Sequence, residues 1–189
     1  MNDMRQAVMT EPGKILLHEV EAPIAGPGEI LLRVKKIGVC GSDIHVWHGL
    51  HPFTPYPVVQ GHEFSAVVEA VGDGVTKAAP GMKATAAPQK VCGVCNPCKC
   101  GDYHICDELT VCGFQAPGCA QELFVVPEER VVVFGDSLTF EQAVEWIAEG
   151  LMVTEPLITS HFPFDKFAEA YQYIEEQGET TLKVVIDVD

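Results

Sequence analysis

The chain has 189 residues and a formal net charge of -15, from 27 acidic residues against 12 basic ones. Its length suffices for one compact domain, and its 47% of hydrophobic residues place it among ordinary globular proteins. An acidic surface repels nucleic acid and anionic membranes, so we expect neither as a partner. The sequence has no apolar run long enough to span a membrane and no signal peptide at Met1, which makes the cytoplasm the expected compartment.

The first two-thirds of the chain alternate short apolar runs with glycine and proline. Six strands are expected, at residues 6–10, 14–20, 29–39, 64–71, 123–126 and 130–134. The turn Glu11-Pro12-Gly13 separates the first two, and the last two are expected to pair around Pro127. Many short strands divided by turns are typical of a small β-barrel or sandwich.

The last third of the chain has the pattern of helices followed by a strand. A capping-box pattern at residues 139–142 predicts a helix that ends before Gly150. Apolar side chains recur with helical spacing between residues 165 and 178, which predicts a second helix. Residues 182–188 alternate between two faces and predict a closing strand. The expected fold class is therefore mainly β with a few helices, an α+β chain.

A cysteine-rich segment in the middle of the chain has metal-binding spacing, C-x-x-C-x-x-C and then a fourth cysteine after seven further residues. Its members are Cys92, Cys95, Cys98 and Cys106. Four thiolates at tetrahedral corners make a closed zinc site, and two-residue gaps let the backbone fold around one ion. We therefore expect a structural zinc here, closed to substrate. Among the other cysteines, Cys100 is a surplus thiol of the same loop, whereas Cys112 and Cys119 are expected to be packing residues.

A second group of metal-ligating residue types lies earlier in the chain. Residues 38–45 read Gly-Val-Cys-Gly-Ser-Asp-Ile-His, and Gly-His-Glu follows at 61–63. Cys40 ends an expected strand, and His62 with Glu63 opens the next, so a loop brings them together. A thiolate, an imidazole and a carboxylate are the mixed ligand set of a zinc site that keeps one position open.

The residues around these ligands have supporting roles in this interpretation. Asp43 can accept the spare N–H of His62 and fix its tautomer. Ser42 is placed to take the proton of an alcohol substrate, and His45 to pass it to solvent. Each residue has an ordinary alternative on its own: core packing for Cys40, a helix surface for His45 and a turn for His62. The combination is what indicates catalysis.

These motifs together resemble the medium-chain zinc-dependent alcohol dehydrogenase family, and their details lean toward the branch of sorbitol, butanediol and threonine dehydrogenases. The resemblance implies a GroES-like barrel with a zinc lobe and a C-terminal helix-strand tail. It implies catalytic zinc on Cys40, His62 and Glu63, structural zinc on the four spaced cysteines, and a proton relay through Ser42 and His45. The activity it implies is oxidation of a secondary alcohol by hydride transfer to NAD(P).

The resemblance also implies a domain organisation. Residues 1–142 correspond to the catalytic domain, with the structural-zinc lobe at about 88–115, and residues 143–189 to a tail that packs back on the same domain. Family members carry a dinucleotide-binding domain between these parts, with a G-x-G-x-x-G turn that this sequence lacks. We therefore expect no NAD(P) site, and very weak or absent turnover with NAD, in this chain alone. Glu155 superficially resembles a further zinc ligand of polyol dehydrogenases, but its surroundings fit the tail better.

Two other functions are compatible with the sequence. A zinc-stabilised barrel can serve as a binding or scaffold module, and an open zinc site can activate water as a weak hydrolase. Ser42 and His45 favour the enzyme part, because a scaffold has no need of a proton relay. The partners implied are a small alcohol or polyol and either a separate nucleotide-binding domain or a second copy of the chain.

Overall fold

The computed structural model of the protein describes residues 3–134 and 157–188. The strands are β1 (Asp3–Glu11), β2 (Lys14–Glu21), β3 (Glu29–Gly38), β4 (Val58–Val59), β5 (Glu63–Val71), β6 (Lys83–Ala86), β7 (Gln89–Lys90), β8 (Thr110–Val111), β9 (Leu123–Pro127), β10 (Val131–Phe134), β11 (Ile158–Pro163) and β12 (Lys183–Asp187). The helices are α1 (Gly41–Trp47), α2 (Asn96–Cys100) and α4 (Phe167–Gln177), with single 3-10 turns at Tyr103–Ile105, Glu128–Arg130 and Phe164–Lys166.

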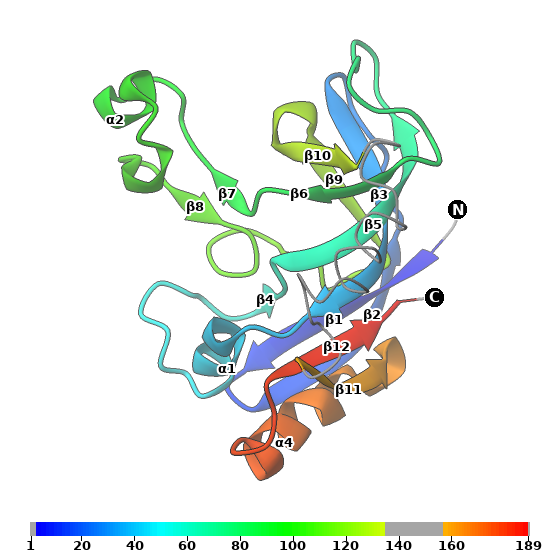
Figure 1. The fold of residues 1–189 in the computed structure, drawn as a ribbon, viewed down its shortest axis with the longest axis vertical. Coiled ribbons are helices and arrows are strands. Elements are labelled where there is room, and N and C mark those ends of the chain that lie inside the picture. The colour runs from blue at the N-terminus through cyan, green and yellow to red at the C-terminus, as the bar shows by residue number, and fades with distance from the viewer. Residues whose placement is uncertain (1–2, 135–156, 189) are drawn as a thin grey trace, which may run out of the picture.

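The centre of the molecule is a seven-stranded sheet (Figure 1). In it β10, β6, β5, β3, β12 and β11 follow one another, and β9 pairs with the first half of β3. A three-stranded sheet has the order β2-β1-β4, and β7 pairs with β8 in a short ribbon. This arrangement confirms the expected mainly-β, α+β fold.

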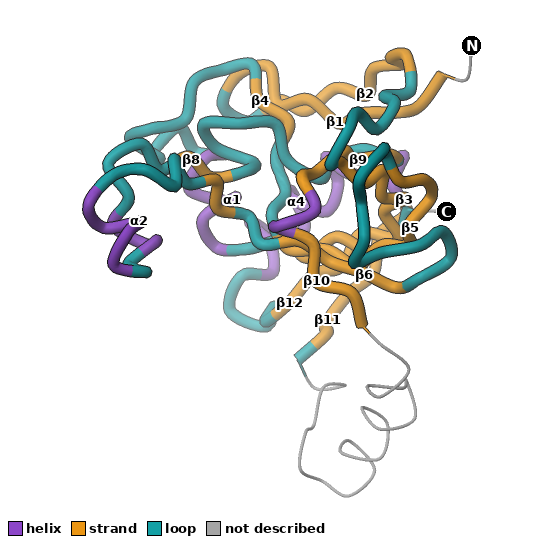
Figure 2. Tube along the Cα trace, turned by 90° about the horizontal axis from the view of Figure 1, so that it is seen from above, coloured by secondary structure: helices purple, strands orange, loops and turns teal. Residues whose placement is uncertain are grey.

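The cysteine-rich segment forms a lobe that extends away from the central sheet. It contains β7, α2 and β8, and Figure 1 shows these three elements projecting from the end of β6. Figure 2, seen at right angles, shows α2 and β8 on the opposite side of the molecule from β3 and β5. The lobe therefore has little sheet structure to hold it, which is the situation in which a small segment depends on a bound metal.

The C-terminal elements close the central sheet. Strand β12 pairs antiparallel with β3 and parallel with β11, and α4 packs on β11, β12 and β2. The helix predicted between residues 165 and 178 is confirmed, and its side chains Phe167 and Tyr171 are buried in the core. The helix expected at 139–150 lies outside the described residues. No helix within the described ranges has both the length and the apolar character that a bilayer crossing needs.

The expected strands are confirmed, but the expected pairing around Pro127 is wrong. Strand β9 pairs with β3, and β10 pairs with β6. The 3-10 turn at Glu128–Arg130 connects β9 to β10. Strand β10 then joins the edge of the sheet beside β6 instead of folding back on β9 as a hairpin. Each strand thus pairs with a partner distant in sequence.

The register of β3 explains how Cys40 and His62, from the two motifs at residues 38–45 and 61–63, come together. Gly38, at the end of β3, lies opposite Glu63 of β5 on one side and Val185 of β12 on the other. Cys40 follows β3 and His62 precedes β5, so antiparallel pairing places them at the same edge of the sheet. The same edge receives the start of β12.

The segment before His62 is held by unusually close backbone packing. The amides of Gly118, Cys119 and Ala120 donate to the carbonyls of Val59, Gly61 and Gln60, at 2.7, 2.9 and 2.9 Å respectively. A Cβ on Gly118 would lie 2.2 Å from the Gly61 oxygen and 2.3 Å from the Gln60 oxygen, so no larger residue fits there.

We predict that Gly118→Ala destabilises the fold by about 1–3 kcal/mol, because the added methyl group must push apart two backbone segments. Urea unfolding of the metal-loaded protein measures the effect. Gly41→Ala is the control, since a Cβ at this position at the start of α1 meets nothing within 4 Å. Equal unfolding midpoints for the two variants would contradict the prediction.

Candidate metal centres

The four spaced cysteines come together in the lobe as their spacing predicts. Their sulfur atoms all lie within 4.8 Å of one another, and the Sγ atoms of Cys95 and Cys106 are 3.9 Å apart. A tetrahedron with Zn–S bonds of about 2.3 Å has edges of about 3.8 Å, so the residues fit a zinc ion. The backbone N–H groups of Cys92 and Cys95 point at the sulfurs of Cys106 and Cys92, both at 3.3 Å, as donors do toward thiolates.

The thiols of the metal-free lobe differ in how readily they ionise. Backbone N–H groups of Asp107 and Cys98 lower the pKa of Cys95 to about 7. Burial and the neighbouring Cys95 raise the pKa of Cys98 to about 12. The lobe therefore favours one thiolate but opposes a full set of four, which a divalent metal would stabilise.

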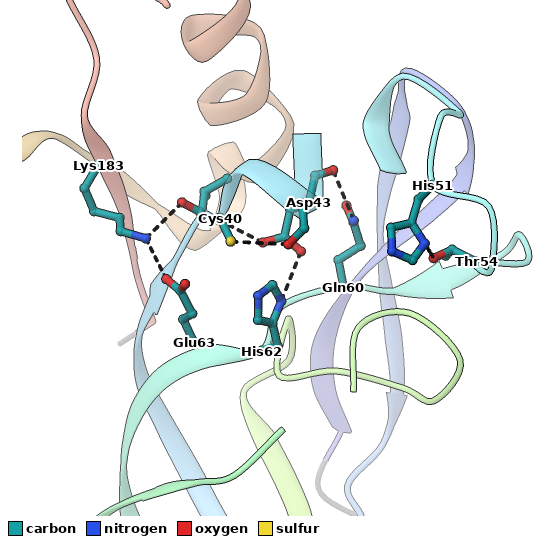
Figure 3. A network of polar contacts seen from close by, with 10 residues as sticks. Cys40, Asp43, His51, Thr54, Gln60, His62, Glu63 and Lys183 are labelled. Carbon is teal, nitrogen blue, oxygen red and sulfur yellow. Dashed lines mark hydrogen bonds and ion pairs between the residues drawn. The ribbon is translucent and has the colours of Figure 1, made fainter. Parts of the chain in front are cut away.

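A second cluster lies at the edge of the sheet where β3 ends and β5 begins. Ligand atoms of Cys40, His62 and Glu63 lie within 4.8 Å of one another, and all three side chains are partly buried. Figure 3 shows the His62 ring pointing toward Asp43 and Cys40, with Glu63 beside it. These residues offer one sulfur, one nitrogen and one oxygen ligand. Three protein ligands fit a zinc ion whose fourth coordination position is open.

Asp43 connects the two halves of this cluster. Its side chain is only 1% exposed, and one carboxylate oxygen, Oδ2, accepts the Cys40 N–H at 2.9 Å. The other oxygen, Oδ1, lies 3.5 Å from His62 Nδ1, and neither of these two buried atoms has a hydrogen-bond partner in the described parts of the chain. With Nδ1 at the Asp43 carboxylate, Nε2 is the ring nitrogen that remains for a metal.

The charge of Asp43 governs the protonation of His62. Burial lowers the pKa of His62, but the contact with the Asp43 carboxylate and a further one with Cys40 outweigh it and raise the pKa to about 9. In the metal-free protein the imidazole therefore carries a proton at neutral pH, and a metal must displace that proton.

We predict that zinc affinity at the Cys40 cluster rises about tenfold per pH unit for each proton displaced. For His62 the rise continues up to about pH 9, its pKa in the folded protein. Because this pKa lies above the 6.5 of an exposed histidine, the metal-free fold is stabilised below about pH 6.5 and loses that stabilisation as the pH approaches 9.

Competition with a coloured chelator measures the affinity, with Cys40→Ser as the reference for zinc bound in the lobe. Asp43→Asn removes the charge that raises the His62 pKa. In this variant the increase of zinc affinity with pH should therefore end at a lower pH than in the wild-type chain. Affinities that do not change with pH in the wild-type chain would refute a protonated His62.

The two expected relay residues lie on α1. The Ser42 hydroxyl donates to Cys40 Sγ at 3.2 Å, which places it beside the candidate metal ligands. His45 follows one helical turn later and is exposed to solvent. Ser42 and His45 thus lie three residues apart on the same short helix, one beside Cys40 and the other facing water.

Two supporting residues are not indicated by any sequence motif. Lys183 of β12 donates to Glu63 Oε2 at 2.6 Å and to the Val39 carbonyl at 3.3 Å. Burial opposes ionisation of Glu63, but the Lys183 ion pair outweighs it and lowers the pKa of Glu63. The buried Gln60 donates to the Asp43 carbonyl at 3.3 Å. The alternation of residues along β12 could have predicted that Lys183 lies off the buried face of the strand. It could not have predicted that Lys183 pairs with Glu63.

The remaining cysteines and aromatic residues have ordinary positions. Cys100 is exposed on the lobe, whereas Cys112 and Cys119 are buried packing residues, as expected. Trp47 packs on Tyr171 in the core with ring centroids 5.4 Å apart. Glu155 lies outside the described residues.

Comparison with known proteins gives consistent matches. The family model of the alcohol dehydrogenase GroES-like domain matches residues 26–136, more than half of the chain. The chain is 37% identical over 141 residues to the starvation-sensing protein RspB of Escherichia coli K12. It is 33% identical over 148 residues to an L-threonine 3-dehydrogenase of Rhizobium etli CIAT 652. These alignments cover 75% and 76% of this chain but only 42% and 43% of the relatives, so the chain spans less than half of their length.

A solved structure likewise matches most of this chain but only about half of its own length. The crystal structure of a candidate zinc-binding dehydrogenase from Sinorhizobium meliloti 1021, bound to NADP, matches with a TM-score of 0.67 and 29% sequence identity. The match covers 86% of this chain and 49% of that one.

Proposed function

The chain belongs to the medium-chain zinc-dependent alcohol dehydrogenase family, and on that premise we propose that it supplies the zinc site and the proton relay for oxidation of a secondary alcohol or polyol. The observation that carries the proposal is the cluster of Cys40, His62 and Glu63 with Asp43 behind it. A structural zinc is closed by four protein ligands, whereas a catalytic zinc is held by three and keeps a position open for substrate, and this cluster offers three ligands.

Each residue of the cluster has a distinct part in this chemistry. Zinc held there would act as a Lewis acid on the substrate oxygen. Ser42, beside Cys40, accepts the hydroxyl proton of the substrate as it releases its own toward His45, and His45 passes a proton on to water. Asp43 keeps the imidazole of His62 in the tautomer that binds metal.

The hydride acceptor in this proposal is NAD(P) bound to a domain other than the one described. The S. meliloti dehydrogenase was solved with NADP and is about twice as long as the part that matches this chain. The glycine-rich turn that cradles a dinucleotide does not occur in these 189 residues. The chain thus contributes substrate binding and proton transfer, and the nucleotide-binding domain contributes the cofactor.

We predict that the purified chain binds two zinc ions, because it contains two separate sets of ligands that fit the ion. Metal analysis by mass spectrometry should find a loss of one zinc in Cys40→Ser. Cys98→Ser, which removes a buried ligand of the lobe, should lose the other zinc and keep the first. One zinc in the wild-type chain, unaffected by Cys40→Ser, would exclude the proposed catalytic site.

A further inference from the structure

His51 lies beside the Cys40 cluster without belonging to any of the motifs. It is part of the loop between α1 and β4, and its ring stacks on Phe114 with centroids 4.6 Å apart and planes at 25°. Phe114 in turn contacts the ring of His62, with centroids 5.0 Å apart. One aromatic ring therefore separates His51 from a candidate zinc ligand.

The orientation of the His51 ring is determined by two contacts. The stack on buried Phe114 holds one face, and the Thr54 hydroxyl lies 2.7 Å from Nδ1. Figure 3 shows Thr54 on the side of the ring away from His62 and Asp43. The second nitrogen, Nε2, has no hydrogen-bond partner in residues 3–134 or 157–188. A fixed ring with one unused nitrogen is a preorganised hydrogen-bonding group.

The surroundings of His51 favour an uncharged partner. Its loop neighbours Leu50 and Phe53 are 69% and 70% exposed and apolar. The cation of the network, Lys183, is ion-paired with Glu63 on the opposite side of the cluster (Figure 3). In this network of described residues a carboxylate or phosphate group would meet no unpaired lysine or arginine, whereas a hydroxyl group needs only one donor or acceptor.

We propose that His51 Nε2 hydrogen-bonds a second hydroxyl group of the substrate, so that this residue selects polyols over alcohols with a single hydroxyl. The inference rests on the proposed function, because it places the reacting hydroxyl at the Cys40 cluster. Recognition by a fixed polar group is an effective form of selection, since an analogue without the hydroxyl leaves that group unpaired.

A purely structural role for His51 predicts a different behaviour. If the ring only anchors the loop, its replacement affects all alcohols alike. His51→Phe separates the two roles, because phenylalanine keeps the stack on Phe114 and lacks the nitrogen atoms. The matched control is His48→Phe, since His48 lies three residues earlier in the chain and its Nε2 is paired with Glu175 at 2.6 Å.

The test is a titration of the cobalt-loaded, full 189-residue chain, which needs no nucleotide. The visible bands that Cys40→Ser lacks report the candidate catalytic site, and sorbitol and cyclohexanol are the two six-carbon probes. His51→Phe should weaken sorbitol binding about tenfold, the loss of roughly one hydrogen bond, and leave cyclohexanol binding nearly unchanged. His48→Phe should change neither. Circular dichroism checks that each variant is folded.

The possible failures are distinguishable. Equal weakening of both probes in His51→Phe, or no weakening of sorbitol, would overturn the role of His51 and leave the metal site intact. Cobalt bands that are identical in the wild-type chain and in Cys40→Ser would overturn the proposed function, and the role of His51 with it.

Discussion

The contact of Asp43 with both Cys40 and His62 is the interaction on which the candidate catalytic centre depends. A buried carboxylate is costly unless its charge is compensated. Here the compensation comes from the Cys40 N–H and from the imidazole of His62. The Asp43 side chain therefore contacts both the Cys40 backbone, before the first turn of α1, and the imidazole of His62. The same charge makes His62 hold a proton until a metal replaces it.

The central strand β3 brings the parts of this centre together. Its end pairs with the start of β5 on one side and with β12 on the other, so Cys40, Glu63 and Lys183 meet although they are far apart in sequence. The close packing of Gly118 on the backbone before His62 adds a third constraint. The residues of the candidate centre are thus brought together by the pairing of strands distant in sequence, and no single loop holds them all. The zinc lobe differs, because its four ligands come from one short segment.

This difference explains how much of the protein could be predicted from its sequence. The four lobe cysteines and the Cys40 and His62 motifs are recognisable because each depends on a few residues at short, regular spacing. Lys183 is 120 positions from its partner Glu63, and a single sequence does not tell which strand the last strand joins. The wrong pairing of β9 with β10 has the same cause. No sequence motif marks His51, because Thr54 and Phe114 approach it only in the folded loops.

Cadmium NMR of the metal-exchanged chain tests the central claim most directly, because the chemical shift of cadmium depends on how many sulfur atoms bind it. Two resonances are expected, one from the four-cysteine lobe and one upfield of it from the mixed cluster of Cys40, His62 and Glu63. Cys40→Ser should remove or shift only the second. A single resonance of the four-sulfur type, unchanged by Cys40→Ser, would contradict the presence of a catalytic metal site in this chain.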